Sequence, residues 1–110
     1  MTETVEKIKL LKSAPDFSTA TYQIHDESHT IGNALRWMLM KNYKVEFCGY
    51  SVPHPSENVI NIRIQMYDNA SSLNTLIDAL SQLDNVCEAV EDSYLASLRE
   101  GIFERWEERY

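Results

Sequence analysis

The last forty residues of the chain carry the pattern that most restricts how it can fold. From Ser71 onward, apolar residues recur at alternating steps of three and four residues, which is the period of one helix face. The spacing predicts one helix from Ser71 to Trp106, about 54 Å long at about 1.5 Å per residue. Gly101 weakens the prediction for the last turns, because glycine costs about 1 kcal/mol relative to alanine in a helix. The apolar series is Leu73, Leu76, Leu80, Leu83, Cys87, Val90 and Tyr94, followed in a shifted register by Leu98, Ile102 and Trp106.

The segments before this helix alternate with the period of β-strands, apart from one shorter helix. The predicted strands are Val5 to Leu11, Phe17 to His25, Val45 to Val52 and Val59 to Tyr67. The last strand points apolar side chains one way and polar side chains the other, as in an antiparallel sheet covered on one side. Between the second and third strands, a helix ending near Asn42 is predicted from the spacing of Ile31, Ala34, Leu35, Met38 and Leu39. The order ββαββα predicts an α+β fold in a single domain, residues 1–110.

The length of the final helix predicts a partner. Each strand spans only about 20 Å, so the sheet cannot cover the whole helix. An apolar seam left in water would be unfavourable, and another chain is expected to cover it. The alternative is a helix that ends near Gly101 and packs fully on its own sheet.

The first helix also has apolar residues away from its core stripe. At about 100° per residue, Trp37 and Met40 lie on the far side, beside Asn33 and Arg36. Trp and Met are enriched at protein interfaces, although single exposed apolar residues are common. We therefore predict an obligate dimer with both helices at the interface.

Charge and composition restrict the class of protein. The formal net charge is −7, from 17 acidic and 10 basic residues. An acidic chain does not attract phosphate backbones, so direct nucleic-acid binding by this chain is not expected. No segment has the roughly 20 apolar residues needed to cross a bilayer, and the N-terminus does not read as a secretory signal. Two cysteines without a Cys-x-x-Cys pair suit a reducing, intracellular compartment.

Catalytic, cofactor and metal sites have no clear candidates in the sequence. His25 and His29 are four residues apart, but they straddle a strand end and a helix start, so they are not expected to form a zinc pair. Gly32 stands alone rather than in a phosphate-binding loop. No nucleophile, base and orienting group form a recognisable set. We therefore expect no catalytic residue, no cofactor and no metal in this chain.

The segment from His29 to Asn42 reads His-Thr-Ile-Gly-Asn-Ala-Leu-Arg-Trp-Met-Leu-Met-Lys-Asn. It resembles the α-motif of RNA polymerase subunits, which in bacterial α subunits includes Thr-Leu-Gly-Asn-Ala-Leu-Arg-Arg. Segments from Val45 to Tyr50, from His54 to Glu57 and from Ile60 to Gln65 extend the resemblance, which covers roughly Tyr22 to Leu98. Together they resemble the small α-like subunits of polymerases. Glu-Phe-Cys at 46–48 and Asn-Val-Cys at 85–87 favour the member shared by eukaryotic polymerases I and III.

This resemblance implies a four-stranded antiparallel sheet with two helices on one face. It implies pairing with a larger α-like subunit, and a heterodimer on which the two large catalytic subunits assemble. Catalysis and its magnesium would belong to those large subunits, so this chain would be non-catalytic. The corresponding location is the nucleus, including the nucleolus.

The resemblance and the two partner signals together define a predicted dimer interface. By the motif, Thr30 would start the helix and Gly32 would allow a close approach in its first turn. Trp37 stands where the bacterial motif has its second Arg, so a contact made by that Arg cannot be the same here. The predicted interface comprises Thr30, Gly32, Asn33, Arg36, Trp37, Met40, Leu73, Leu76, Leu80, Leu83, Cys87, Val90, Tyr94 and Leu98.

Other functions remain open from the residues alone. The chain could be the small α-like subunit of polymerase II or of an archaeal polymerase. It could be a homodimeric regulatory domain of ferredoxin-like type, which requires one surface to pair with itself. It could also be a small enzyme with a site between protomers, which requires a polar pocket with perturbed ionisable groups.

Overall fold

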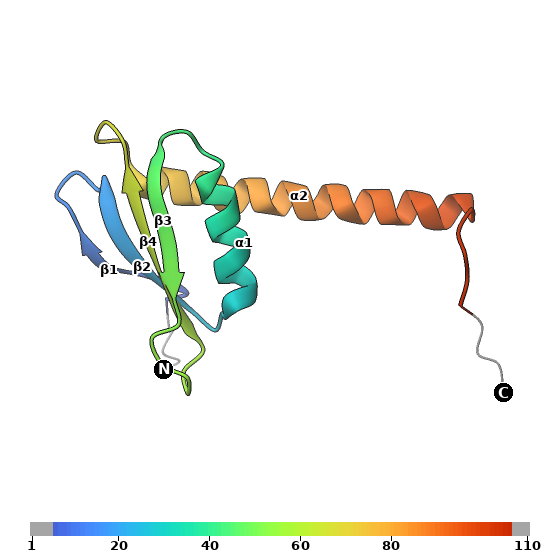
Figure 1. Ribbon diagram of the computed structural model, residues 1–110, viewed down its shortest axis with the longest axis horizontal. Helices are drawn as coiled ribbons and strands as arrows, with labels where there is room; N and C mark the ends of the chain where they lie inside the picture. The colour runs from blue at the N-terminus through green and yellow to red at the C-terminus, as the bar shows by residue number, and fades with distance from the viewer. Residues whose placement is uncertain (1–5, 107–110) are drawn as a thin grey trace, which may run out of the picture.

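The computed structural model describes residues 6–106 and contains the predicted order of elements (Figure 1). Four strands and two helices alternate as ββαββα, which confirms the prediction. They are β1 (Ile8–Ser13), β2 (Thr19–His25), α1 (His29–Met40), β3 (Val45–Ser51), β4 (Val59–Met66) and α2 (Ser72–Glu100).

The four strands form one antiparallel sheet in the order β1-β2-β4-β3. Tyr22 of β2 lies opposite Ile62 of β4, and Ile24 lies opposite Ile60. These side chains share one face of the sheet and are almost completely buried. The predicted alternation of apolar and polar side chains in β2 and β4 is therefore confirmed.

Both helices pack on this apolar face. Leu35 and Leu39 of α1 and Leu76 and Ala79 of α2 join the same buried cluster as the strand residues. Two hydrogen bonds fix the start of α2. The Ser72 hydroxyl donates to the Phe17 carbonyl oxygen, and the Ser72 Oγ accepts from the Tyr22 hydroxyl at 2.9 Å. The predicted arrangement of two helices on one face is confirmed.

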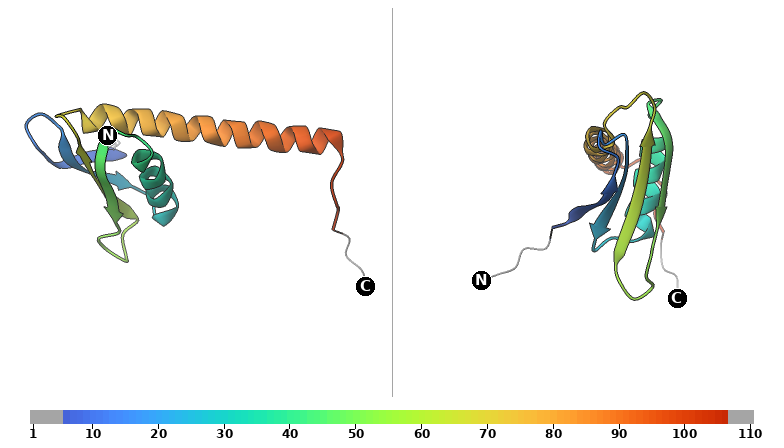
Figure 2. Two further views of the ribbon diagram at one scale, coloured as in Figure 1. Left: turned by 45° about the horizontal axis from the view of Figure 1, so that its top comes forward. Right: turned by 90° about the vertical axis from the view of Figure 1, so that its left-hand side faces the viewer.

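α2 continues far beyond the sheet as one straight helix (Figures 1 and 2). Its 29 residues correspond to about 43 Å. It ends at Glu100, about two turns before Trp106, at the glycine that weakened the prediction for the last turns. Gly101 adopts a left-handed conformation with φ 69°, and its N–H donates to the Ser97 carbonyl. Glycine readily takes this conformation and so terminates the helix.

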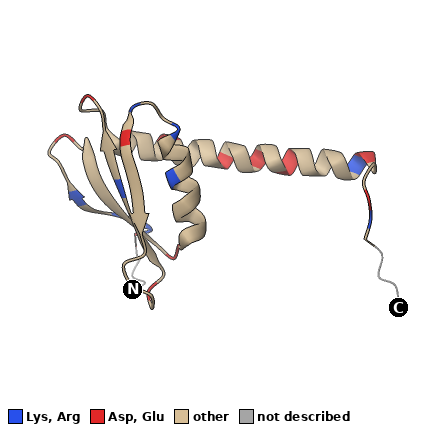
Figure 3. Ribbon diagram, viewed as in Figure 1, with Lys and Arg blue, Asp and Glu red and all other residues tan. Residues whose placement is uncertain are grey.

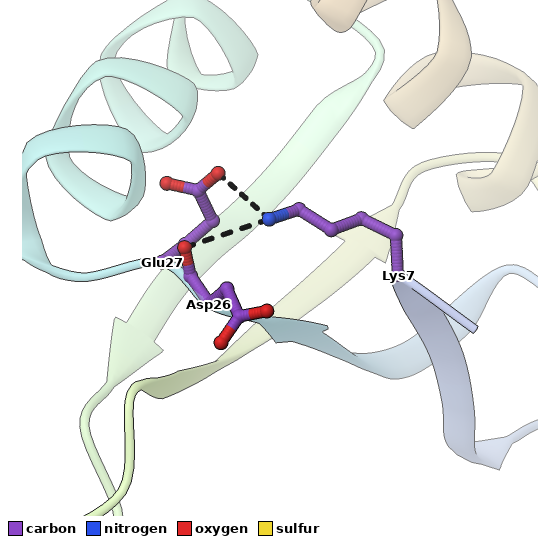
Figure 4. A network of polar contacts seen from close by, with 3 residues as sticks. All are labelled: Lys7, Asp26 and Glu27. Carbon is purple, nitrogen blue, oxygen red and sulfur yellow. Dashed lines mark hydrogen bonds and ion pairs between the residues drawn. The ribbon is translucent and has the colours of Figure 1, made fainter. Parts of the chain in front are cut away.

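The first strand and the first helix differ from prediction in detail. β1 begins at Ile8, and Val5 lies outside the described residues. α1 begins at His29, one residue before the predicted start at Thr30, and ends at Met40, two residues before Asn42. Ser28 occupies the N-cap position, and its side chain makes no capping hydrogen bond. Instead, Lys7 bridges the chain just before α1, with its Nζ 2.9 Å from a Glu27 carboxylate oxygen and 3.5 Å from the Asp26 carbonyl oxygen (Figure 4).

Candidate subunit interface

The far half of α2 is exposed along its whole circumference. Every residue from Asp84 to Glu100 is exposed in the isolated chain. The large apolar residues there, with their exposed fractions, are Val86 (41%), Val90 (63%), Tyr94 (63%), Leu95 (39%) and Leu98 (46%). The sheet ends before this part of the helix, so no element among residues 6–106 covers it. Single exposed apolar residues are ordinary, but a row of them along one helix indicates an interaction site.

The apolar series runs without a break from the core into this exposed half. Leu80 and Leu83 are half-buried and pack against the core cluster. Cys87, Val90, Tyr94 and Leu98 follow at helical spacing and are exposed. We call the series Leu80, Leu83, Cys87, Val90, Tyr94 and Leu98 the α2 seam. It gives a partner chain a surface that is already continuous with this chain's own core.

The outer side of α1 provides the second exposed apolar surface. Trp37 is 52% exposed and Met40 is 44% exposed. Thr30, Asn33 and Arg36 are exposed on the same helix. The Lys41 ammonium lies 4.2 Å from the centroid of the Trp37 ring. A cation over a tryptophan face is attracted by the ring quadrupole, so Trp37 keeps a defined partner while half of its surface stays free.

Two predicted interface residues belong instead to the chain's own interior. Leu76 is 1% exposed and lies in the core cluster between α2 and the sheet. Gly32 is buried as well. The apolar spacing of α2 does not distinguish the half that packs on its own sheet from the half that does not. Leu76 and Gly32 are therefore removed from the candidate interface.

The close approach expected at Gly32 is made to Tyr50 of the same chain. A Cβ atom at position 32 would lie 2.6 Å from the Tyr50 ring, closer than such atoms normally come. The Tyr50 hydroxyl lies 2.9 Å from His29 Nδ1, one turn earlier in α1. Tyr50 thus fixes the first turn of α1 against β3, and Gly32 leaves room for its ring.

Replacing Gly32 with alanine should destabilise the chain. Overpacking a filled site typically costs about 1–3 kcal/mol, which should exceed the gain in helix propensity of about 1 kcal/mol. Chemical denaturation of Gly32→Ala should show the loss. The double variant Gly32→Ala with Tyr50→Ala should recover most of it relative to Tyr50→Ala alone. If Gly32→Ala lowers the free energy of unfolding by the same amount with and without the Tyr50 ring, Tyr50 is not the reason for glycine at this position.

Several exposed apolar residues lie outside the predicted set. Those on α2 and in the segment after it are Ile77 (54%), Val86, Leu95, Ile102 (88%), Phe103 (43%) and Trp106 (83%). Ile77 stands four residues after Leu73, and Val86 stands four residues before Val90, so both are neighbours of predicted residues on the helix surface. A prediction that assigned a wider face of the helix to the interface, rather than one narrow row, would have included Ile77 and Val86. Leu73 itself is 42% exposed, near the covered end of α2.

Ionisable groups in the described part of the chain do not assemble a catalytic or metal centre. Residues 6–106 contain no cluster of three or more His, Cys, Asp or Glu side chains that could hold a metal ion. Burial raises the pKa of the Cys48 thiol to about 11, despite the opposing effect of Arg36. This thiol therefore stays protonated at neutral pH and is a poor nucleophile. Among these same residues, no helix is long and apolar enough to span a membrane.

Comparison with known proteins identifies the family. Residues 19–93 match the family described as the RNA polymerase Rpb3/Rpb11 dimerisation domain. The chain is 49% identical over 96 residues to the DNA-directed RNA polymerases I and III subunit RPAC2 of Saccharomyces cerevisiae, covering 86% of this chain and 68% of that one. It is 42% identical over 99 residues to the Schizosaccharomyces pombe protein of the same name, covering 89% and 79%.

A solved structure shares the fold. The crystal structure of DNA-directed RNA polymerase subunit L from Thermoplasma acidophilum superposes with a TM-score of 0.72, covering 89% of this chain and 96% of that one. The sequences are 13% identical, so this similarity supports the fold alone. A dimerisation-domain family is consistent with the exposed apolar surfaces of α1 and α2. The chain therefore belongs to the RNA polymerase Rpb3/Rpb11 dimerisation domain family, in which its relatives include the RPAC2 subunits of polymerases I and III.

Proposed function

We propose that this chain is the non-catalytic small α-like subunit of RNA polymerases I and III. It pairs with a larger α-like subunit, and the heterodimer is the platform on which the two large catalytic subunits assemble. The polymerases so formed transcribe ribosomal RNA and small RNAs such as 5S RNA and tRNA. The observation that carries this proposal is the α2 seam, a continuous apolar row that leaves the core and that, beyond Leu83, is not covered by any of residues 6–106.

The charge of α2 favours a heterodimer over a homodimer. Between Ser72 and Glu100 its only basic residue is Arg99. The acidic residues are Asp78, Asp84, Glu88, Glu91, Asp92 and Glu100. Figure 3 shows acidic positions along the part of α2 that projects beyond the sheet. A two-fold homodimer uses the same surface twice, so it would bring two acidic helices together. A different chain can present apolar residues flanked by basic ones.

The state of the Cys48 thiol supports a non-catalytic role for this chain. Among residues 6–106, Cys48 is the thiol whose pKa is raised by burial, and it is therefore protonated at neutral pH. Catalysis in the assembled enzyme is then the task of the large subunits. The two polymerases work in the nucleus, with polymerase I in the nucleolus, and we propose both locations for this chain.

Affinity purification of the tagged chain under gentle conditions tests the proposal. We expect to recover a larger α-like protein together with two pairs of very large subunits, one pair from each polymerase. Recovery of the large subunits of polymerase II instead would show that the chain belongs to polymerase II and would overturn the proposal. Recovery of this chain alone as a stable homodimer would overturn the heterodimer.

Alkylation of the two cysteines offers a test at residue level. Cys87 is exposed in the α2 seam, whereas Cys48 is 1% exposed. In the free chain, iodoacetamide at pH 8 should label Cys87 and leave Cys48 unmodified. Binding of the larger α-like subunit should slow the labelling of Cys87 by about tenfold or more, because a covered thiol is inaccessible to the reagent. Mass spectrometry of timed samples measures both rates, and unchanged labelling of Cys87 in the complex would place the interface elsewhere.

A further inference from the structure

No helix or strand among residues 6–106 covers the face of the sheet opposite the helices. The register of the strands places on it Lys9 and Lys12 of β1, Thr21 and Gln23 of β2, Asn61, Arg63 and Gln65 of β4, and Phe47, Gly49 and Ser51 of β3. We call these residues the outer sheet face. They are mainly polar, and the Gln23 amide donates to the Asn61 side-chain oxygen at 3.2 Å. Neither helix approaches this side.

Bulges in both edge strands bring specific side chains to this face. In β1 the register shifts between Leu10, which lies opposite the buried Tyr22, and Lys12, which lies opposite Thr21. A bulge adds one residue, so the side chains beyond it change face. Lys12 therefore joins Lys9 instead of pointing toward the core. An equivalent shift in β3 places Phe47 on the outer side.

The charge of the outer sheet face is opposite to that of the whole chain. Its paired positions carry Lys9, Lys12 and Arg63, with no Asp or Glu. The acid beside them is Glu46, at the bulge of β3. Figure 3 shows basic positions on β1 and β4, in contrast to the acidic α2. A cationic surface on a chain of net charge −7 is complementary to an acidic partner.

Two depressions meet at Arg63 on this face. One, of about 250 Å³, is bordered by Lys12, Thr21 and Arg63. The other, of about 370 Å³, is bordered by Phe47, Asn61 and Arg63. The Phe47 ring lies over Gly49, where a Cβ atom would come within 3.0 Å of it, and is 47% exposed. Arg63 thus stands between a second cation and a flat aromatic surface.

We propose that the outer sheet face is a docking surface for an acidic, extended segment of a protein other than the helix partner. The Arg63 guanidinium binds a carboxylate of that segment, since its planar fork matches carboxylate geometry. Lys12 binds a neighbouring acid, and the exposed Phe47 ring contacts an apolar side chain. Single-stranded nucleic acid fits less well, because it uses several stacking aromatics and a broadly basic protein.

Site-specific photo-cross-linking in the assembled complex tests the proposal. A benzoylphenylalanine in place of Ser51, at the rim of the second depression, is activated in complexes purified through the tagged chain. We expect a cross-linked peptide rich in Asp and Glu, from a protein other than the larger α-like subunit. The same probe in place of Asp68, an exposed loop residue, should not capture it. Cross-links to nucleic acid only, to a peptide without acids or to nothing would overturn the proposal.

Charge reversal separates a charge-dependent contact from mere proximity. Arg63→Glu should lower the yield of the cross-link by about tenfold. Lys44→Glu makes the same change in net charge outside both depressions and should leave the yield unchanged. Replacing the captured acids with lysines should restore the yield with Arg63→Glu. Equal cross-link yields for Arg63→Glu and Lys44→Glu would overturn the proposal. If Arg63→Glu lowers the melting temperature of the chain, Arg63→Gln is used in its place.

The outcome is independent of the proposed polymerase function. Both charge variants should still co-purify with the larger α-like subunit, because neither Arg63 nor Lys44 belongs to the α2 seam. Loss of the polymerase subunits from the purification would count against the proposed function. Loss of the acidic cross-link with the subunits still present would count against the outer sheet face.

Discussion

Replacing Trp37 with aspartate should abolish pairing with the larger α-like subunit while the isolated chain stays folded. Trp37 is 52% exposed, so its removal leaves no cavity in the core. In the heterodimer, the substitution removes a large aromatic contact and buries an unpaired carboxylate, which together cost several kcal/mol. Isothermal titration of the two purified subunits measures the effect, and a loss of affinity of at least about a thousandfold is expected.

A second exposed aromatic provides the matched control. Phe47 is 47% exposed but lies on the outer sheet face, away from both helices. Phe47→Asp makes the same kind of change and should leave the affinity of the two subunits nearly unaltered. If Trp37→Asp binds as tightly as Phe47→Asp, the outer side of α1 is not part of the interface.

Replacing Leu76 with aspartate should unfold the chain before any partner is considered. Leu76 is 1% exposed and packs between α2 and the sheet. The substitution loses the burial of a leucine and places a carboxylate in an apolar core. The combined loss of folding free energy is comparable to the whole stability of a typical domain, about 5–15 kcal/mol. Circular dichroism should show loss of the cooperative thermal transition.

Leu73 is the control for this substitution because it lies one turn earlier on the same helix. It is 42% exposed, so Leu73→Asp should keep the cooperative transition and most of the melting temperature. The two variants have the same charge and the same helix propensity. A folded Leu76→Asp chain would show that α2 is not held against the sheet as described.

Periodicity predicted the elements because each has one side in an apolar core. The strand β2 keeps strict alternation over its full length, and β4 keeps it from Ile60 to Met66. The side chains that this alternation turns toward the helices are buried. The bulges in β1 and β3 were not predicted. A bulge depends on pairing with the neighbouring strand, and one extra residue leaves little trace in a short alternating segment.

Periodicity could not divide α2 into a covered and an uncovered half. Leu76 and Val90 occupy equivalent positions in the apolar series, yet one is 1% and the other 63% exposed. What distinguishes them is where the sheet ends, which is a property of the packed structure. The close packing of Tyr50 on Gly32 likewise joins residues from α1 and β3 that no local pattern connects.

The mass of the complex formed by the co-expressed subunits tests the central claim most directly. The account predicts that this 12.7 kDa chain sediments with the larger α-like subunit as one species, with one copy of each. It also predicts that the chain alone, folded and dispersed at low concentration, aggregates without a defined stoichiometry as its concentration rises, because the α2 seam is uncovered. A well-behaved monomer in isolation that forms no complex with the larger subunit would contradict the account, as would a stable dimer at twice the chain mass.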